Sequence, residues 1–428
     1  MKKTNLLIKL IALALVICTA TLLLASCGKK AQTTVLSFEA DGKTYTISEE
    51  EFALLMRIRK RIIFCNLLYT TSKDTASFWA TKSSEDAEKT NEQYYKEIVM
   101  DQIKAVLVEK YLFDKNGLSI SQDTLDGYKS SIKTAEKEQG GKGAYKQYYG
   151  YTAKTYYEVY EPMVYRSENL YKTLCADDGE LALTAENLKS YYEEHYVGYQ
   201  YIVLDMKNKV VLDEEGNRVL ATKKEKDEDG NEIEVDDTAY KKEELTTEEK
   251  EDKQNLGASI LKELENGTLT FEQAIEKYSD EYYSVEFSEG WFVDKEGTFV
   301  NATVTDKVKD LEIGETFAEV ITSGDYQYIV KRIDLKADVY EKYEKDENGD
   351  VLKDENDKEV ENKYYEFFED FEETVKYDKY EKYVESYFDQ ITVDSAIVES
   401  YTLQNTFLSP YVDYYYQMIL YYYYGIQI

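Results

Sequence analysis

Histidine is almost absent from this chain of 428 residues, in which His195 is the only one. No group of histidines and cysteines has the spacing of metal ligands, and no glycine-rich phosphate loop is present. We therefore predict that the protein has no metal site and no cofactor. We interpret His195 as a surface residue at the end of a helix that precedes a strand.

Positive charge is also scarce, because 52 lysines and arginines face 85 aspartates and glutamates, which gives a net charge of −33. Nucleic-acid binding relies on basic surface that neutralises phosphates, and binding flat on anionic lipid has the same requirement. We therefore predict no nucleic-acid partner. The acidic surface could attract basic clients by electrostatic steering, but solubility alone is the explanation that we favour.

Long apolar runs are missing except at the start of the chain. Lys2 and Lys3 precede an apolar stretch over residues 6–24, and Leu24-Ala25-Ser26-Cys27-Gly28 then matches a bacterial lipobox. This order is typical of an export signal. We predict removal of residues 1–26 and lipidation of Cys27, which would anchor the protein to the outer face of the cytoplasmic membrane. The alternative is an uncleaved transmembrane anchor in which Cys27 has no role.

Cysteine is nearly as rare as histidine. Once Cys27 is lipidated and the segment before it is removed, Cys65 and Cys175 remain. They could form a disulfide outside the cytoplasm or remain as two buried free thiols, and the sequence leaves both open.

Residues 31–195 contain mainly helix signals after an initial hairpin. Residues 35–39 and 43–47 flank Asp41-Gly42, which predicts two strands joined by a tight turn. Ser48 and Glu51 form a capping box that begins a helix, and the stem of Arg59 can lie along the apolar face of that helix. Further helix starts and stops follow at Asn116-Gly117, Ser121, Gly140–Gly143, Thr152 and Thr184.

Residues 258–333 carry a more specific pattern. An amphipathic helix over 258–267 ends in Asn-Gly, and residues 271–280 read Phe-Glu-Gln-Ala-Ile-Glu-Lys-Tyr-Ser-Asp. Gly290-Trp-Phe292, then Leu311-Glu-Ile-Gly-Glu315 and a strand over 326–333 follow. This order resembles a parvulin peptidyl-prolyl isomerase domain, in which Phe-x-x-Ala-x-x-Tyr-Ser, Gly-x-(Trp/Phe)-Phe and Leu-x-x-Gly-Glu occur in the same sequence.

The N-terminal half resembles the chaperone arm of PrsA-type foldase lipoproteins and of the related SurA chaperones. The matching segments are Ile47–Phe52, Gly117–Ser121 and Leu183–Glu193. In this family the chain returns from the isomerase domain to the arm through one long helix. An apolar stripe of that kind is present here, followed by an apparent strand over 391–397; the stripe consists of Tyr364, Phe368, Phe371, Val375, Tyr383 and Tyr387.

The resemblance implies an α+β fold, in which a discontinuous helical chaperone arm contains an inserted parvulin-like α+β domain. The predicted parts are a signal peptide 1–26, a tether 27–34, the arm 35–195, the parvulin-like domain 196–335 with an acidic insertion 206–253, an acidic connector 336–362, the returning helix and strand 363–410, and a tyrosine-rich tail 411–428. The glycines of the acidic turns fall too early for calcium loops, so we expect solvated hairpin tips there.

The resemblance also indicates where an active site would lie. The family carries one histidine on each of two central strands, and both positions are tyrosine here, Tyr201 and Tyr328. They are the catalytic candidates if the domain is active, since isomerisation requires only that a twisted amide be stabilised against a barrier of about 18–20 kcal/mol. The interpretation that we favour is that they are packing residues of a domain kept for binding, because a fold does not establish an activity. The candidate substrate-binding residues are Trp291, Phe292, Val300 and Val304.

We therefore predict a membrane-anchored extracytoplasmic folding factor that binds unfolded, newly exported proteins and has isomerase ancestry. The resemblance is also compatible with a homodimer. The alternative is a solute-binding or adhesive surface lipoprotein without enzymatic activity, which would require two α/β lobes with parallel sheets. Eight tyrosines between Tyr411 and Tyr424 could bind unfolded polypeptide or form a low-complexity tail without function.

Overall fold

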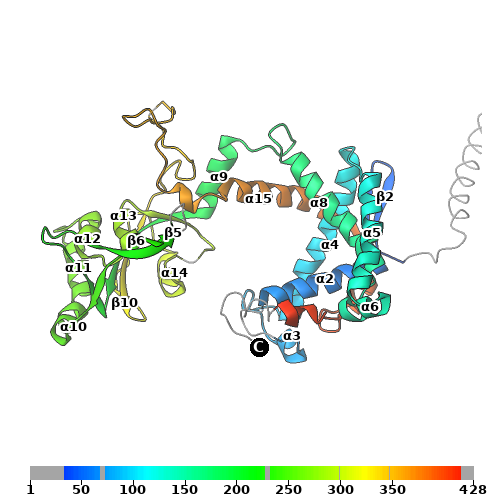
Figure 1. Cartoon of the computed structure of the whole chain (residues 1–428), viewed down its shortest axis with the longest axis horizontal. Coiled ribbons are helices and arrows are strands. Elements are labelled where there is room, and N and C mark those ends of the chain that lie inside the picture. Colours follow the sequence, from blue (N-terminus) through cyan, green and yellow to red (C-terminus); the bar gives the residue numbers. More distant parts are fainter. Residues whose placement is uncertain (1–32, 68–72, 227–231, 298, 347, 416–428) are drawn as a thin grey trace, which may run out of the picture. The chain divides into compact units, whose positions relative to one another are not determined.

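The computed structural model describes residues 33–67, 73–226, 232–297, 299–346 and 348–415. Cys27, and the tyrosine-rich tail beyond residue 415, lie outside the described residues. The chain divides into two compact units, of which the first comprises Met1–Ala182 with Lys376–Ile428 and the second comprises Leu183–Val375. Both contain helices and strands, so the fold is of the α+β class (Figure 1). No helix in the described part is long and apolar enough to cross a membrane.

The first unit begins with the predicted hairpin. Strands β1 (Thr34–Ala40) and β2 (Lys43–Ser48) are antiparallel, and β11 (Ile391–Val393) pairs with the other edge of β1. Asp41 and Gly42 have φ values of 52° and 73°, as a tight hairpin turn requires, so this prediction is confirmed. The Ser48 hydroxyl accepts from the Glu51 amide at 3.3 Å, and Glu51 accepts from the Ser48 amide at 2.8 Å, which confirms the capping box.

Helices make up the rest of this unit. They are α2 (Glu49–Leu67), α3 (Ala76–Ala80), α4 (Asn91–Lys115), α5 (Gln122–Glu138), α6 (Lys142–Tyr149), α7 (Ala153–Thr155), the π-helix η2 (Tyr156–Tyr160), α8 (Glu161–Leu174), the later part of α15 (Phe371–Glu385), the 3₁₀ helix η4 (Phe388–Gln390) and α16 (Ser395–Ser400). The core lies where α2, α4, α8 and α15 meet β1, and its buried side chains include Leu36, Phe52, Leu107, Leu170 and Tyr380. Among the described residues, Cys65 and Cys175 form no disulfide, and Cys175 is buried whereas Cys65 is half-buried.

Two expectations for the C-terminal segment need correction. The returning helix begins only at Phe371, because Tyr364 and Phe368 pack into the second unit's core around a 3₁₀ turn, η3 (Tyr365–Phe367). The strand expected over 391–397 ends at Val393, because the Asp394 side chain caps α16 by accepting from the Ile397 amide at 3.2 Å.

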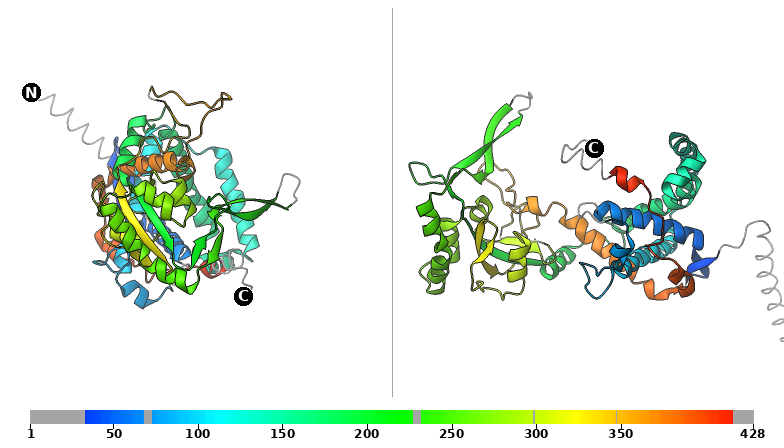
Figure 2. Two further views of the ribbon diagram at one scale, coloured as in Figure 1. Left: turned by 90° about the vertical axis from the view of Figure 1, so that its left-hand side faces the viewer. Right: turned by 90° about the horizontal axis from the view of Figure 1, so that it is seen from below.

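The second unit is built on a four-stranded antiparallel sheet in the order β8-β3-β10-β9. Its green and yellow strands face the viewer in the left view of Figure 2. The strands are β3 (Tyr196–Asp205), β8 (Trp291–Asp294), β9 (Ile321–Ser323) and β10 (Tyr326–Ile333). Helices α11 (Leu256–Glu265) and α12 (Phe271–Tyr278) cover one face, and α14 (Ala302–Val308) covers the other. Because side chains alternate along a strand, Ile202 and Leu204 belong to the first face, whereas Tyr201 and Val203 belong to the second.

A third cluster extends the second unit beyond the predicted 196–335. Tyr192 of α9 (Ala185–His195), together with Tyr340, Tyr364 and Phe371, packs against Phe292. The predicted connector 336–362 therefore contributes buried side chains to this unit. His195 ends α9, and its half-buried ring stacks on Tyr191 at a centroid distance of 4.1 Å.

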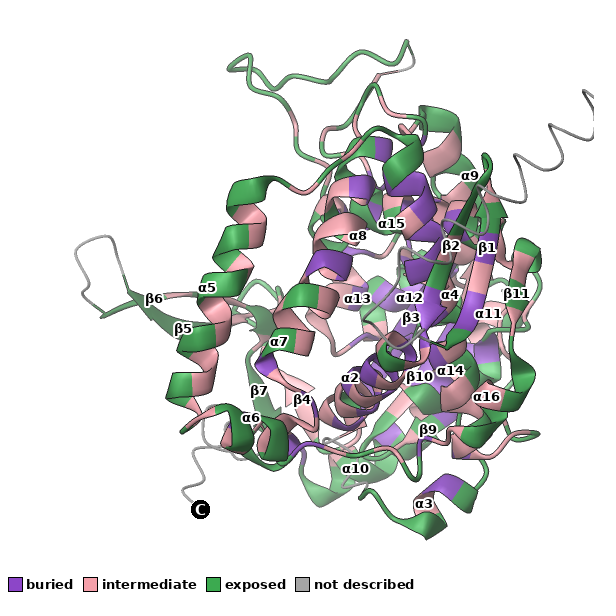
Figure 3. Cartoon of the chain, turned by 90° about the vertical axis from the view of Figure 1, so that its right-hand side faces the viewer, coloured by how far each residue is buried: buried purple, intermediate pink, exposed green. Residues whose placement is uncertain are grey.

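The acidic insertion 206–253 forms two strand pairs and a helix. Strand β4 (Asn208–Val210) pairs with β7 (Lys242–Glu244), β5 (Leu220–Lys226) pairs with β6 (Glu232–Tyr240), and α10 (Thr247–Gln254) follows. The Asp213 carboxylate stabilises the turn that follows it by accepting hydrogen bonds from the backbone amides of Glu215 and Asn217 at 2.9 and 2.8 Å. Burial mapped on the ribbon shows that β5 and β6 are largely exposed (Figure 3).

Candidate functional site

Tyr201 and Tyr328 lie on adjacent strands and on the same face of the sheet. Tyr201 of β3 is opposite Val330 of β10, and Tyr328 is opposite Val203, so the two tyrosines are diagonal neighbours. Both are buried, with exposed fractions of 6% and 7%. The structure therefore brings the two catalytic candidates together, but beneath other side chains.

The Tyr201 hydroxyl is held by a carboxylate. It donates a hydrogen bond to Glu281 Oε2 at 3.1 Å. The same oxygen accepts from the Ser284 amide at 2.8 Å, because Glu281 caps helix α13 (Tyr282–Glu286). Burial raises the pKa of Tyr201, and the Glu281 charge raises it further. Tyr201 is consequently neutral, and its hydroxyl hydrogen already forms a hydrogen bond with Glu281.

Aromatic and aliphatic side chains fill the space above this face. The Phe299 ring lies 4.6 Å from the ring of Tyr199 and 5.4 Å from that of Tyr201, edge to face with the latter. Val304 of α14 is fully buried in the same cluster, and the Asn301 side chain caps that helix by accepting from the Val304 amide at 3.1 Å. The face around Tyr201 is therefore packed as a core.

The other predicted substrate-binding residues are divided between locations. Trp291 is opposite Tyr199 on the tyrosine face, with its ring 6.4 Å from that of Tyr201. Phe292 is opposite Gly198 on the other face and packs against Tyr364 at 5.2 Å. Val300 is 41% exposed and has a φ of 53°, a conformation that is rare for a β-branched residue. The structure thus unites Trp291 and Val304 with the two tyrosines, but not Phe292 or Val300.

Sequence reasoning missed Phe299 and Glu281, the two residues that contact Tyr201 most directly. Phe299 is one position away from the predicted Val300, so a shift of one residue in the aligned register would have identified it. Glu281 directly follows the Tyr278-Ser279-Asp280 end of the recognised motif and precedes a short helix, which is a recognisable capping position.

A small cavity of about 210 Å³ lies beside Tyr199 and Phe299. Arg332 lines it and donates to the carbonyl oxygens of Lys309 and Leu311 at 3.3 and 3.2 Å. Neither Tyr201 nor Tyr328 lines this cavity, so it is separate from the predicted catalytic positions. Among the described residues there is no group of three histidine, cysteine or acidic side chains that could hold a metal ion.

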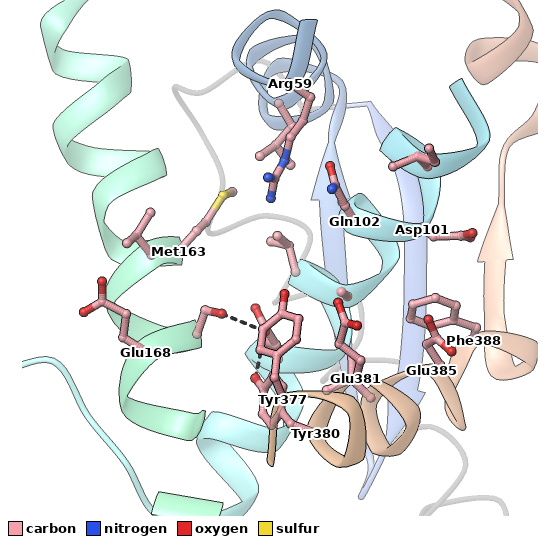
Figure 4. A pocket seen from close by; sticks show the side chains of 18 of the residues that line it. Arg59, Asp101, Gln102, Met163, Glu168, Tyr377, Tyr380, Glu381, Glu385 and Phe388 are labelled. Carbon is pink, nitrogen blue, oxygen red and sulfur yellow. Dashed lines mark hydrogen bonds between the residues drawn. The ribbon is translucent and has the colours of Figure 1, made fainter. Parts of the chain in front are cut away.

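A larger cavity, of about 470 Å³, lies entirely within the first unit (Figure 4). Side chains from α2, α4, η2, α8, α15 and η4 line it. Its apolar and aromatic lining consists of Leu55, Ile98, Ala105, Val106, Tyr160, Met163, Val164, Tyr377, Tyr380, Val384 and Phe388. Its polar lining consists of Arg59, Asp101, Gln102, Glu109, Ser167, Glu168, Glu381 and Glu385.

A buried carboxyl group is held at the wall of this cavity. Glu109 is 7% exposed and accepts hydrogen bonds from the Tyr380 hydroxyl at 2.7 Å and the Ser167 hydroxyl at 2.8 Å. Burial raises the pKa of Glu109, and these two hydrogen bonds partly oppose the shift. The three residues come from α4, α15 and α8, so the network ties together three segments that are distant in sequence.

Arg59 points from α2 toward the centre of the cavity (Figure 4). Its Nε atom is buried and has no hydrogen-bond partner among the described residues. The sequence had marked Arg59 only as a long stem on an apolar helix face. A charged residue within an otherwise apolar stripe was the available signal for the cavity, but the other walls come from segments that no local pattern connects.

No known protein-family model and no curated protein matches this chain. Solved structures with some similarity include PrsA from Bacillus subtilis, with 15% identity over 74% of this chain and 88% of that chain and a TM-score of 0.21. Foldase protein PrsA from Streptococcus pneumoniae has 14% identity over 91% and 94%, with a TM-score of 0.21. Peptidylprolyl isomerase (PrsA) from Bacillus anthracis has 12% identity over 70% and 94%, with a TM-score of 0.20. These TM-scores are too low to carry an argument about this chain.

Proposed function

We propose that this protein is a lipid-anchored extracytoplasmic folding factor, which binds unfolded exported proteins and whose parvulin-like domain has lost isomerase activity. The observation that carries the proposal is the cavity of the first unit. Its volume of about 470 Å³ is within the range of ligand sites, and its lining combines eleven apolar or aromatic side chains with eight polar or charged ones. Such a lining suits stretches of unfolded polypeptide, which present apolar side chains and backbone polar groups together.

Loss of isomerase activity is supported by the packed tyrosine face. An isomerase needs an open apolar pocket for the proline ring and hydrogen-bonding groups that face the twisted amide. Phe299 and Val304 occupy the space above Tyr201, and the Tyr201 hydroxyl already donates to Glu281. A substrate would have to displace these groups before it could reach either tyrosine.

The anchor is supported by the sequence alone, through the lipobox that ends at Cys27. Attachment at the outer face of the cytoplasmic membrane would hold the folding factor where exported chains emerge. The solute-binding alternative lacks support, because every strand pair among the named strands of the described residues is antiparallel, whereas two α/β lobes would require parallel sheets.

Two assays on the chain from residue 28 onward test this function. The first follows light scattering of a heat-unfolded client protein, and we expect the chain to suppress its aggregation. The second follows cis–trans isomerisation of a proline peptide, and we expect no acceleration above the uncatalysed rate. Failure to suppress aggregation would contradict the binding function, and robust catalysis would contradict the loss of activity.

A further inference from the structure

We propose that the cavity of the first unit selects polypeptide segments that are both apolar and cationic, with Glu381 and Glu385 receiving a lysine or arginine side chain and Arg59 donating to a backbone carbonyl. This inference rests on the proposed function, because it names the class of polypeptide that the cavity binds. The proposed function names unfolded polypeptide as the ligand, and this inference adds a preference for positively charged segments.

Negative charge along the cavity is compensated only in part, because Arg59 is the one cation among its lining residues. Asp101 is paired with Lys104 at 2.7 Å. Within the described part of the chain, Glu168, Glu381 and Glu385 form no ion pair. Glu381 and Glu385 are four residues apart on α15, so their like charges are neighbours on one helix face. A bound cation would relieve this repulsion.

The titration behaviour of Glu381 agrees with this geometry. Burial raises the pKa of Glu381, and the charges of Glu385 and Asp378 raise it further, whereas a hydrogen bond with Tyr377 opposes the shift. A lysine or arginine side chain placed between Glu381 and Glu385 would favour the charged form of both carboxyl groups. Glu381 and Glu385 are both exposed, so they lie where a ligand can reach them, and added salt should weaken this attraction.

The remaining walls favour apolar neighbours for that cation. Leu55, Val106 and Met163 present aliphatic surface, and methionine adapts to side chains of different shape. Tyr377 and Phe388 add aromatic rings near the two glutamates. A small hydrated cation would leave this surface uncovered, whereas a basic residue flanked by aliphatic residues would cover it.

Arg59 supplies the donor that a peptide backbone needs. Its guanidinium is directed into the cavity, and it forms no ion pair or hydrogen bond among the described residues (Figure 4). An unsatisfied buried donor is unfavourable, so a carbonyl oxygen brought by a ligand would stabilise the complex. A basic side chain and a backbone carbonyl occur together in a polypeptide, which is why we favour this ligand over a free amine.

The test uses the chain from residue 28 onward and three short fluorescent peptides that share the same apolar positions and carry lysine, glutamine or glutamate at the others. Binding is followed by fluorescence anisotropy. We expect the lysine peptide to bind roughly tenfold more tightly than the glutamine peptide, and the glutamate peptide to bind most weakly. Equal binding of all three would overturn the charge preference and leave the proposed function intact, whereas a lack of binding to any peptide and to unfolded client would contradict both.

Variants locate the preference. Glu381→Gln with Glu385→Gln should abolish the difference between the lysine and glutamine peptides. Glu381→Lys with Glu385→Lys should reverse the order so that the glutamate peptide binds best, a gain that misfolding cannot produce. The matched control, Glu138→Gln with Glu399→Gln, removes two exposed carboxylates that do not line the cavity and should keep the original order. If the lysine preference survives in both cavity variants, the cavity is not its source.

Discussion

Tyr201 and Glu281 are joined by a hydrogen bond of 3.1 Å between the phenol and the carboxylate. The two residues are 80 positions apart, one on the central strand β3 and the other at the start of α13. Tyr201 stands at the position where the family resemblance implies a catalytic histidine, and this contact occupies its hydroxyl group. The Tyr201 hydroxyl therefore already donates its hydrogen within the second unit, which agrees with the proposed loss of isomerase activity.

Tyr201→Phe should therefore destabilise the second unit without reducing client binding. The substitution keeps the ring against Phe299 but removes the donor to a largely buried carboxylate, which costs about 1–3 kcal/mol. Urea unfolding measures the loss, and the aggregation assay measures client binding. Tyr326→Phe is the control, because Tyr326 lies on the neighbouring strand and is 38% exposed. Isomerase activity that Tyr201→Phe or Tyr328→Phe abolished would instead make these tyrosines catalytic.

Glu109→Gln should change how stability depends on pH. Because burial raises the pKa of Glu109 in the folded state, the folded protein holds this proton more tightly than the unfolded chain does. The resulting stabilisation is complete below the unfolded pKa and is lost as pH rises through the folded pKa. Glutamine still accepts from Tyr380 and Ser167 but does not titrate.

From pH 4 to pH 7 the natural protein should therefore lose unfolding free energy relative to Glu109→Gln, because only the natural protein carries the titrating group. Urea denaturation across this interval measures it. Glu138→Gln, at an exposed position, should give a difference that hardly changes with pH. A constant difference for Glu109→Gln as well would mean that this carboxyl has the same pKa in both states.

Local features of the fold could be predicted because their physical cause lies within a few residues. The Asp41-Gly42 turn needs only two residues with positive φ, and the Ser48–Glu51 capping box needs only a spacing of three. The same holds for the helix start at Thr184, whose side chain accepts from the Asn187 amide at 3.2 Å. In each case the two interacting residues lie within three positions of each other in the sequence.

The contacts that define the two sites could not be predicted in this way. Phe299 reaches Tyr201 across nearly a hundred residues, and only tertiary packing decides that Phe299 rather than Val300 faces the sheet. Glu109 and Tyr380 are 271 residues apart, so no spacing links them. The sequence shows the apolar stripe that begins at Tyr364. It does not show that Tyr364 and Phe368 pack into the second unit before the helix begins at Phe371.

Cys27→Ala should yield an unprocessed precursor that carries no lipid. The reason is chemical, since acylation requires the cysteine thiol that the lipobox places directly after the small residues. Metabolic labelling with a fatty acid, followed by gel mobility, measures both effects in a bacterial host. Cys65→Ala is the matched control and should be processed and labelled normally. Normal acylation of Cys27→Ala would eliminate the predicted anchor.

The last prediction concerns which segments fold together. A fragment covering 183–385 should unfold cooperatively, because it contains the four-stranded sheet, the third cluster and all of α15. A fragment covering 33–182 should not, because it lacks β11 and the buried side chains of Tyr380, Val384 and Leu403. Burying a large apolar side chain contributes about 1.5–3 kcal/mol, and domains are stable by only about 5–15 kcal/mol.

Joining residues 33–182 to 371–415 through a flexible linker should restore a cooperative transition. Circular dichroism during heating compares the three fragments, with the chain from residue 28 onward as the reference. The linked fragment also separates two explanations of a failure, since it restores the missing core without adding the second unit's sheet. A sharp transition for 33–182 alone would show that the returning segment is not needed for the first unit's core, and the cavity wall that α15 supplies would then be an addition to a unit that is already stable.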